Sequence, residues 1–97
     1  MALEIIWTPQ AEKGLDNVLH YLEKEWTPRE ILQLGKKINQ ILYQIKNNPD
    51  LYPKSITYKK LHKAIVDKNN YLVYRVNTKK SSIEIIDFRG TKQIEKH

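Results

Sequence analysis

Hydrophobic residues recur along this chain at two different spacings, and the spacing changes near residue 50. Before that point, two long runs place apolar residues every three or four positions, which is typical of amphipathic helices with one buried face. The first run follows Thr8-Pro9 and ends near Trp26. The second follows Thr27-Pro28, whose threonine has capping-box spacing to Glu30, and ends at Asn47-Asn48-Pro49. We predict two helices that share a very short link and therefore form an antiparallel hairpin.

Short β-branched and apolar segments predict the strands. They are Leu3–Trp7, Leu61–Asp67, Tyr71–Val76 and Ser82–Phe88. The last three are joined by short polar connections, which makes them antiparallel neighbours. The predicted fold is an α+β domain of order β-α-α-β-β-β, in which an antiparallel sheet is covered on one face by the N-terminal α-helical hairpin. Residues 1–97 are expected to form one domain, because a chain of 97 residues holds a single core.

The side chains on the uncovered face of the sheet depend on the turn before Tyr71. A two-residue turn sets Lys68 opposite Tyr71, and one face then holds His62, Ala64, Val66, Tyr71, Val73 and Arg75. A three-residue turn sets Asp67 opposite Tyr71, and that face then holds Lys63, Ile65, Tyr71, Val73 and Arg75. Tyr71 and Arg75 share a face in either register, where they could bind phosphates, stack a base or bind an acidic peptide. Alternatively the tyrosines pack the sheet, which is the interpretation that we favour for Tyr74.

The composition excludes several classes of chemistry. The chain has no cysteine, which excludes disulfides, zinc–thiolate sites and thiol nucleophiles. Its three histidines have no partner at ligand spacing, and its three glycines form no phosphate loop, so we expect no metal and no cofactor. No apolar run is long enough to span a membrane, and residues 1–7 lack the features of a signal peptide, so we expect a cytoplasmic protein.

The whole chain has a formal net charge of +6, and the positive charge is concentrated in its second half. The first 53 residues carry six basic and seven acidic side chains, whereas the rest carry eleven basic and four acidic ones. Such asymmetry indicates a polyanion or an acidic protein as a partner, although lysine-rich surfaces are also common in small soluble proteins.

Five short motifs follow one another along nearly the whole chain. They are Trp7-Thr8-Pro9-Gln10-Ala11, Tyr21-Leu22 before Glu25-Trp26, Asn48-Pro49-Asp50-Leu51-Tyr52-Pro53, Leu61–Val66 and Tyr71–Arg75. In their order and spacing, these motifs resemble those of the RelE/ParE superfamily of toxins from bacterial toxin–antitoxin modules, in particular its ParE-like, plasmid-stabilisation type. The resemblance implies a toxin that a cognate antitoxin neutralises by laying a helix or strand across it.

The resemblance also implies an essential target. RelE-like members cleave mRNA on the ribosome, ParE-like members inhibit DNA gyrase, and some members have no established target. If this chain is RelE-like, the catalytic candidates are His62, Lys63, Arg75, Arg89 and Lys92, with His62 as the general base. Contacts with the target or the antitoxin are expected at Tyr71, Arg75, Lys59 and Lys60.

The sequence departs from the superfamily at two arginine positions. The superfamily's "LRK" is Leu61-His62-Lys63 here, and Lys92 falls where relatives carry an arginine after the last strand. Lysine lacks the planar, bidentate grip of arginine on phosphate, and no general base with an orienting partner is visible. We therefore expect growth inhibition through binding, with DNA gyrase as the favoured target. The alternatives are a RelE-like ribosome-dependent mRNA endoribonuclease and a non-toxic binding module of the same fold.

Overall fold

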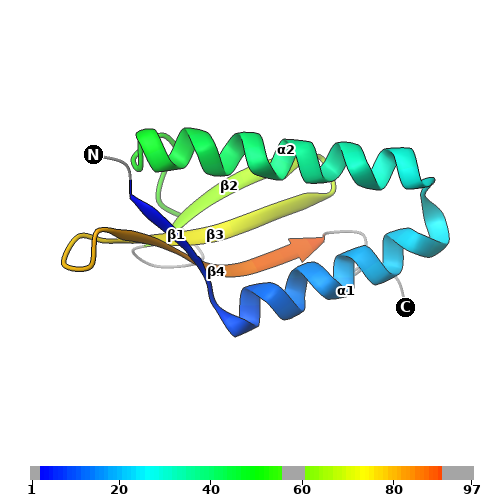
Figure 1. The fold of residues 1–97 in the computed structure, drawn as a ribbon, viewed down its shortest axis with the longest axis horizontal. Coiled ribbons are helices and arrows are strands. Elements are labelled where there is room, and N and C mark those ends of the chain that lie inside the picture. The colour runs from blue at the N-terminus through cyan, green and yellow to red at the C-terminus, as the bar shows by residue number, and fades with distance from the viewer. Residues whose placement is uncertain (1–2, 56–60, 91–97) are drawn as a thin grey trace.

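The expected elements are present, in the expected order, in a computed structural model that describes residues 3–55 and 61–90 (Figure 1). They are strand β1 (Glu4–Trp7), helices α1 (Pro9–Glu25) and α2 (Pro28–Asn47), and strands β2 (His62–Asp67), β3 (Asn70–Asn77) and β4 (Ser82–Gly90). The predicted α+β class is therefore confirmed. Three of the candidate residues, Lys59, Lys60 and Lys92, lie outside the described residues.

The sheet has four strands in the order β1-β4-β3-β2. The pairs β2–β3 and β3–β4 are antiparallel, as short connections require. Strand β1 is parallel to β4, so the sheet is mixed and the expectation of a purely antiparallel sheet is wrong at this one pair. The chain between β1 and β4 includes both helices, and so long a connection puts no tight-turn constraint on the direction of β1.

The turn between β2 and β3 differs from both registers considered for the sequence. Asp67 pairs with Asn70, so the turn consists of Lys68-Asn69. A bulge between Ile65 and Asp67 then sets Ile65, rather than Asp67 or Lys68, opposite Tyr71. The face away from the helices nevertheless holds the set expected for the longer turn, with Val73 fully buried in the middle of it, because the extra residue lies in the bulge instead of in the loop.

Both helices pack on one face of the sheet, α1 mainly against β4 and α2 mainly against β2 (Figure 1). One continuous core joins residues such as Leu22 and Ile41 of the helices to Leu72 and Ile85 of the strands. Each helix begins as its sequence predicts. The Thr8 hydroxyl accepts a hydrogen bond from the backbone of Ala11, and Thr27 and Glu30 form a complete capping box.

Helix α1 lies very close to β4 at Gly14. A Cβ atom here would fall inside the van der Waals contact distance of the Phe88 carbonyl oxygen and would lie 3.3 Å from the carbonyl carbon. The absence of a side chain therefore lets the helix backbone lie directly against the strand. Gly35 in α2 is different, since no atom other than its chain neighbours and the backbone of its own helix lies within 4 Å of an added Cβ there.

Candidate functional site

The face of the sheet that the helices leave uncovered, called the open face below, brings together four of the predicted site residues. These are Lys63 of β2, Tyr71 and Arg75 of β3, and Arg89 of β4. Tyr71 lies directly opposite Arg89, and the Lys63 ammonium is 4.3 Å from the centroid of the Tyr71 ring. The structure thus contains the expected association of basic residues with an aromatic ring, including a cation–π contact.

A carboxylate on the neighbouring strand holds Arg75. Its Nε donates a hydrogen bond of 2.8 Å to Glu84 Oε1, and its Nη2 donates to the same oxygen. The side-chain amide of Asn77 donates to the other oxygen of Glu84 at 3.4 Å. The hydrogen bond from Arg75 is the main reason that the pKa of Glu84 lies below its ordinary value. The pair fixes Arg75 in one orientation on the open face.

Arg89 is held in a similar way by a carboxylate of its own strand. Its Nε donates to Asp87 Oδ2 at 2.8 Å, and Asp87 Oδ1 accepts the backbone N–H of Phe88 at 2.9 Å. Asp87 is almost fully buried. Neither carboxylate was predicted from the sequence. Asp87 could have been predicted as the partner of Arg89, because residues two apart in a strand lie on the same face. Glu84 could be identified as the partner of Arg75 only from the register of the β3–β4 hairpin.

His62 does not join this group of residues. It belongs to the side of β2 that faces the helices, is only 6% exposed and stacks on Tyr74 with ring centroids 4.8 Å apart. Its Nδ1 lies 2.6 Å from the Tyr52 carbonyl oxygen, so Nδ1 donates and, in the neutral ring, Nε2 keeps its lone pair. Nε2 is 4.0 Å from a carboxylate oxygen of Asp50.

A pocket of about 450 Å³ lies beside His62, at the end of the sheet where α2 finishes. It is lined by Leu3, Pro49, Asp50, Lys54, His62, Val76 and Thr78. Nearby, the Tyr74 hydroxyl donates to the Pro49 carbonyl oxygen at 2.7 Å, and burial raises the pKa of Tyr74 to about 12. Tyr74 therefore packs in the core, as predicted, and ties the segment after α2 to β3.

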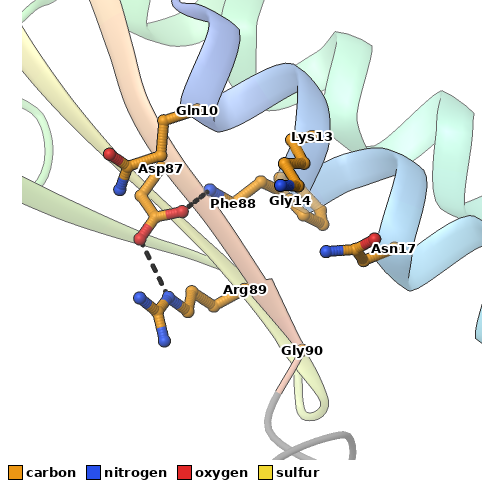
Figure 2. Close-up of a pocket in the computed structure, with 8 residues that line it drawn as sticks. All are labelled: Gln10, Lys13, Gly14, Asn17, Asp87, Phe88, Arg89 and Gly90. Carbon is orange, nitrogen blue, oxygen red and sulfur yellow. Dashed lines mark hydrogen bonds and ion pairs between the residues drawn. The ribbon is translucent and has the colours of Figure 1, made fainter.

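A second polar pocket, of about 390 Å³, lies where α1 meets the end of β4 (Figure 2). Figure 2 shows Lys13 and Asn17 projecting from the helix and the Arg89 guanidinium turned toward the Asp87 carboxylate. Of these residues, only Arg89 was predicted from the sequence as a site residue. The pocket adds Lys13 to the basic groups near the end of β4.

Within residues 3–55 and 61–90, no three His, Asp or Glu side chains are grouped closely enough to hold a metal ion. Neither described helix has the length and apolar character needed to cross a membrane.

The fold is that of a known class of small bacterial toxins. The YoeB/ParE toxin from Agrobacterium tumefaciens superposes with a TM-score of 0.66 and is 17% identical, with 91% of this chain and 98% of that chain covered. The RelBE2 toxin–antitoxin complex from Mycobacterium tuberculosis gives 0.64 at 14% identity, with 93% and 92% covered. The YoeB-YefM complex from Staphylococcus aureus gives 0.59 at 21% identity, with 92% and 97% covered.

The family is shown by a match between the sequence and a family profile. Residues 5–95 match the profile described as the ParE toxin of the type II toxin-antitoxin system, parDE. The chain therefore belongs to the ParE toxin family of the RelE/ParE superfamily, and the expectation from the motifs is confirmed. No curated protein matches the sequence.

Proposed function

We propose that this toxin inhibits growth by binding DNA gyrase, without catalysing a reaction, and that a cognate antitoxin neutralises it. The observation that carries the proposal is the arrangement of cations on the open face. Arg75 is paired with Glu84, Arg89 is paired with Asp87, and Lys63 lies over Tyr71. These contacts orient the side chains for recognition, because each one is fixed before a partner arrives.

A ribonuclease needs a different arrangement. Cleavage by attack of a ribose 2′-hydroxyl requires a base, an acid and cations around the developing charge. Of the candidate residues that the structure describes, only His62 has an imidazole, the side chain that most often serves as a general base, and it lies on the opposite face of the sheet from Lys63 and Arg75. This separation favours binding over RNA cleavage on the open face.

The antitoxin is proposed to cover part of the open face. Two of the similar structures are toxin–antitoxin complexes, which supports a cognate antitoxin as the partner. Ile65, which is 56% exposed, lies opposite Tyr71 on the edge strand and places apolar surface beside the basic residues. An antitoxin segment that folds on the toxin and carries both apolar and acidic side chains fits this combination.

A ribosome-dependent mRNA endoribonuclease is the second candidate, and one observation favours it. His62 lines a pocket that also contains Lys54, so an imidazole and a cation share one cavity, with the His62 Nε2 4.0 Å from a carboxylate oxygen of Asp50. In this case the catalytic residues would line the pocket beside His62 and would not lie on the open face.

The experiment measures thymidine and amino-acid incorporation in cells, minutes after the toxin is induced without its antitoxin. We expect thymidine incorporation to fall first and the purified toxin to inhibit gyrase supercoiling. Arg75→Ala should weaken that inhibition, whereas Arg29→Ala, an exposed arginine of α2, should not. If amino-acid incorporation falls earlier and supercoiling is unaffected, the target is the ribosome and not gyrase. If neither incorporation falls, the chain is a non-toxic binding module.

A further inference from the structure

The positive and negative charges on the strands of the open face balance one another. Within the part of the chain that the structure describes, the cations on these strands are Lys63, Arg75 and Arg89. Glu84 and Asp87 bind the two arginines. Glu4 of β1 is a further carboxylate on this face, because the residues on either side of it pack against the core. The positive charge of the second half of the chain is therefore compensated on these strands.

The two carboxylates lie deeper in the molecule than the arginines that they bind. The side chains of Glu84 and Asp87 are only 15% and 6% exposed, whereas both arginine side chains are about half exposed. Salt screens a buried charge much less than an exposed one. Arg75 lowers the pKa of Glu84, so this carboxylate stays ionised at neutral pH. Any partner of the open face therefore meets arginines whose charge is already compensated.

This arrangement disfavours phosphate at either arginine. A phosphate bound there would lie close to the carboxylate or would break the ion pair, and a largely buried carboxylate that loses its partner is costly. An uncharged acceptor, such as a main-chain carbonyl, meets no such cost. Arg75 uses Nε and Nη2 on Glu84, and a guanidinium has five N–H donors, so donors remain for such an acceptor. Ile6 and Ile65 add exposed apolar surface on the same face.

We propose that Glu84 and Asp87 determine the specificity of the open face, by excluding the phosphate backbone of nucleic acids and admitting a protein partner with uncharged acceptors and apolar side chains. Without these carboxylates, the strands would present uncompensated cations around Tyr71, which is a pattern that binds single-stranded nucleic acid. This role for the two carboxylates deepens the proposed function and rests on it, because it takes the partner of the open face to be a protein.

The first test measures binding of the full-length toxin to a short fluorescent single-stranded RNA by anisotropy, over a range of salt concentrations. The ribose 2′-oxygens of this RNA are methylated, so it cannot be cleaved. Each carboxylate that is removed should let one arginine neutralise a phosphate. Glu84→Gln should therefore steepen the salt slope by about 0.7 and tighten binding about fivefold at about 0.1 M salt, and Glu84→Gln/Asp87→Asn should tighten it about 25-fold.

Two controls separate specificity from net charge. Glu12→Gln removes one exposed carboxylate from α1 and should leave RNA binding unchanged. Arg75→Ala/Glu84→Gln should lose the gain of Glu84→Gln, because the released arginine is then absent. An equal gain in Glu12→Gln, or a gain that survives the loss of Arg75, would overturn the proposal. Asp87→Asn is also measured alone, since its amide oxygen can still accept the Phe88 N–H and it tests the second pair independently.

Inhibition of gyrase supercoiling by the wild type is measured separately. If the wild type leaves gyrase unaffected and the carboxylate variants gain affinity for RNA, the gyrase target is wrong and the specificity role is supported. If the wild type inhibits gyrase and neither carboxylate variant binds RNA more tightly, the specificity role is wrong and the proposed function stands.

Discussion

A single methyl group added at Gly14 should separate α1 from β4. In Gly14→Ala, the new Cβ would meet the Phe88 carbonyl group, which belongs to the backbone of a central strand and cannot rotate away. Restoring an ordinary contact requires the helix to move by about 1 Å. Because Phe88 and the neighbouring core residues are fully buried, that movement also loosens the packing between α1 and the sheet.

Two opposing contributions determine the size of the effect. Alanine is favoured over glycine inside a helix by about 1 kcal/mol. Overpacking typically costs about 1–3 kcal/mol, and a clash with backbone belongs at the upper end of that range. We therefore expect Gly14→Ala to lower the free energy of unfolding by about 2 kcal/mol, which corresponds to a fall of roughly 8–16 °C in Tm for a domain of this size.

Gly35→Ala is the matched control, since it makes the same change in the other helix, where an added Cβ meets nothing. It should raise the free energy of unfolding by about 0.5–1 kcal/mol. The assay is urea unfolding of each variant, followed by tryptophan fluorescence and circular dichroism. A Gly14→Ala protein as stable as Gly35→Ala would refute the argument, because it would mean that α1 can move away from β4 at no cost.

Three further predictions concern the caps and the ionisable groups. Thr27→Ala removes the capping box of α2 and should cost about 1 kcal/mol in urea unfolding, with Thr78→Ala, at an exposed turn, as a neutral control. Tyr74 ionises near pH 10 when unfolded but only near pH 12 when folded, so stability should fall as the pH rises above 10. Tyr74→Phe should lack that fall, and an identical alkaline profile in both proteins would contradict it. The lowered pKa of Glu84 means that its pairing with Arg75 stabilises the fold fully above about pH 4.5 and is lost as the pH falls further. The stability difference between the wild type and Glu84→Gln should therefore shrink between pH 7 and pH 3, and a constant difference would exclude an ionic contribution.

Most of the fold could be predicted from the sequence because its signals are local. Thr8 and Thr27 mark the two helix starts, and the periods of apolar residues distinguish helices from strands. The parallel β1 and the bulge after Ile65 have no comparable local signal. Both depend on how segments distant in the sequence pack together, and neither changes the apolar pattern of the strand itself.

The candidate site was predicted less completely. Tyr71 and Arg75 were expected on one face in either register, and alternation along β3 places them there. The same alternation separates the neighbours His62 and Lys63 onto opposite sides of β2, a separation that a linear motif does not indicate. Glu84 could not be identified as the partner of Arg75 without the pairing of β3 with β4, which fixes which residues lie opposite one another.

The contacts of Asp87 also bear on whether copies of this protein aggregate through the edges of their sheets. Strand β1 pairs with residues 82–85 of β4, so within residues 3–55 and 61–90 no strand lies beside the outer side of β4 beyond Ile85. There the Asp87 carboxylate occupies the Phe88 N–H, and Gly14 lies against the Phe88 carbonyl group. With both groups engaged, this margin offers no template for another copy of the chain, which protects the toxin from edge-to-edge aggregation. The opposite margin of the sheet is β2, whose first residues are covered by the segment around Lys54, since the Lys63 N–H donates to the Pro53 carbonyl. Beyond Lys63, at the exposed Ile65, no described strand lies alongside β2, so an incoming strand would extend the sheet there.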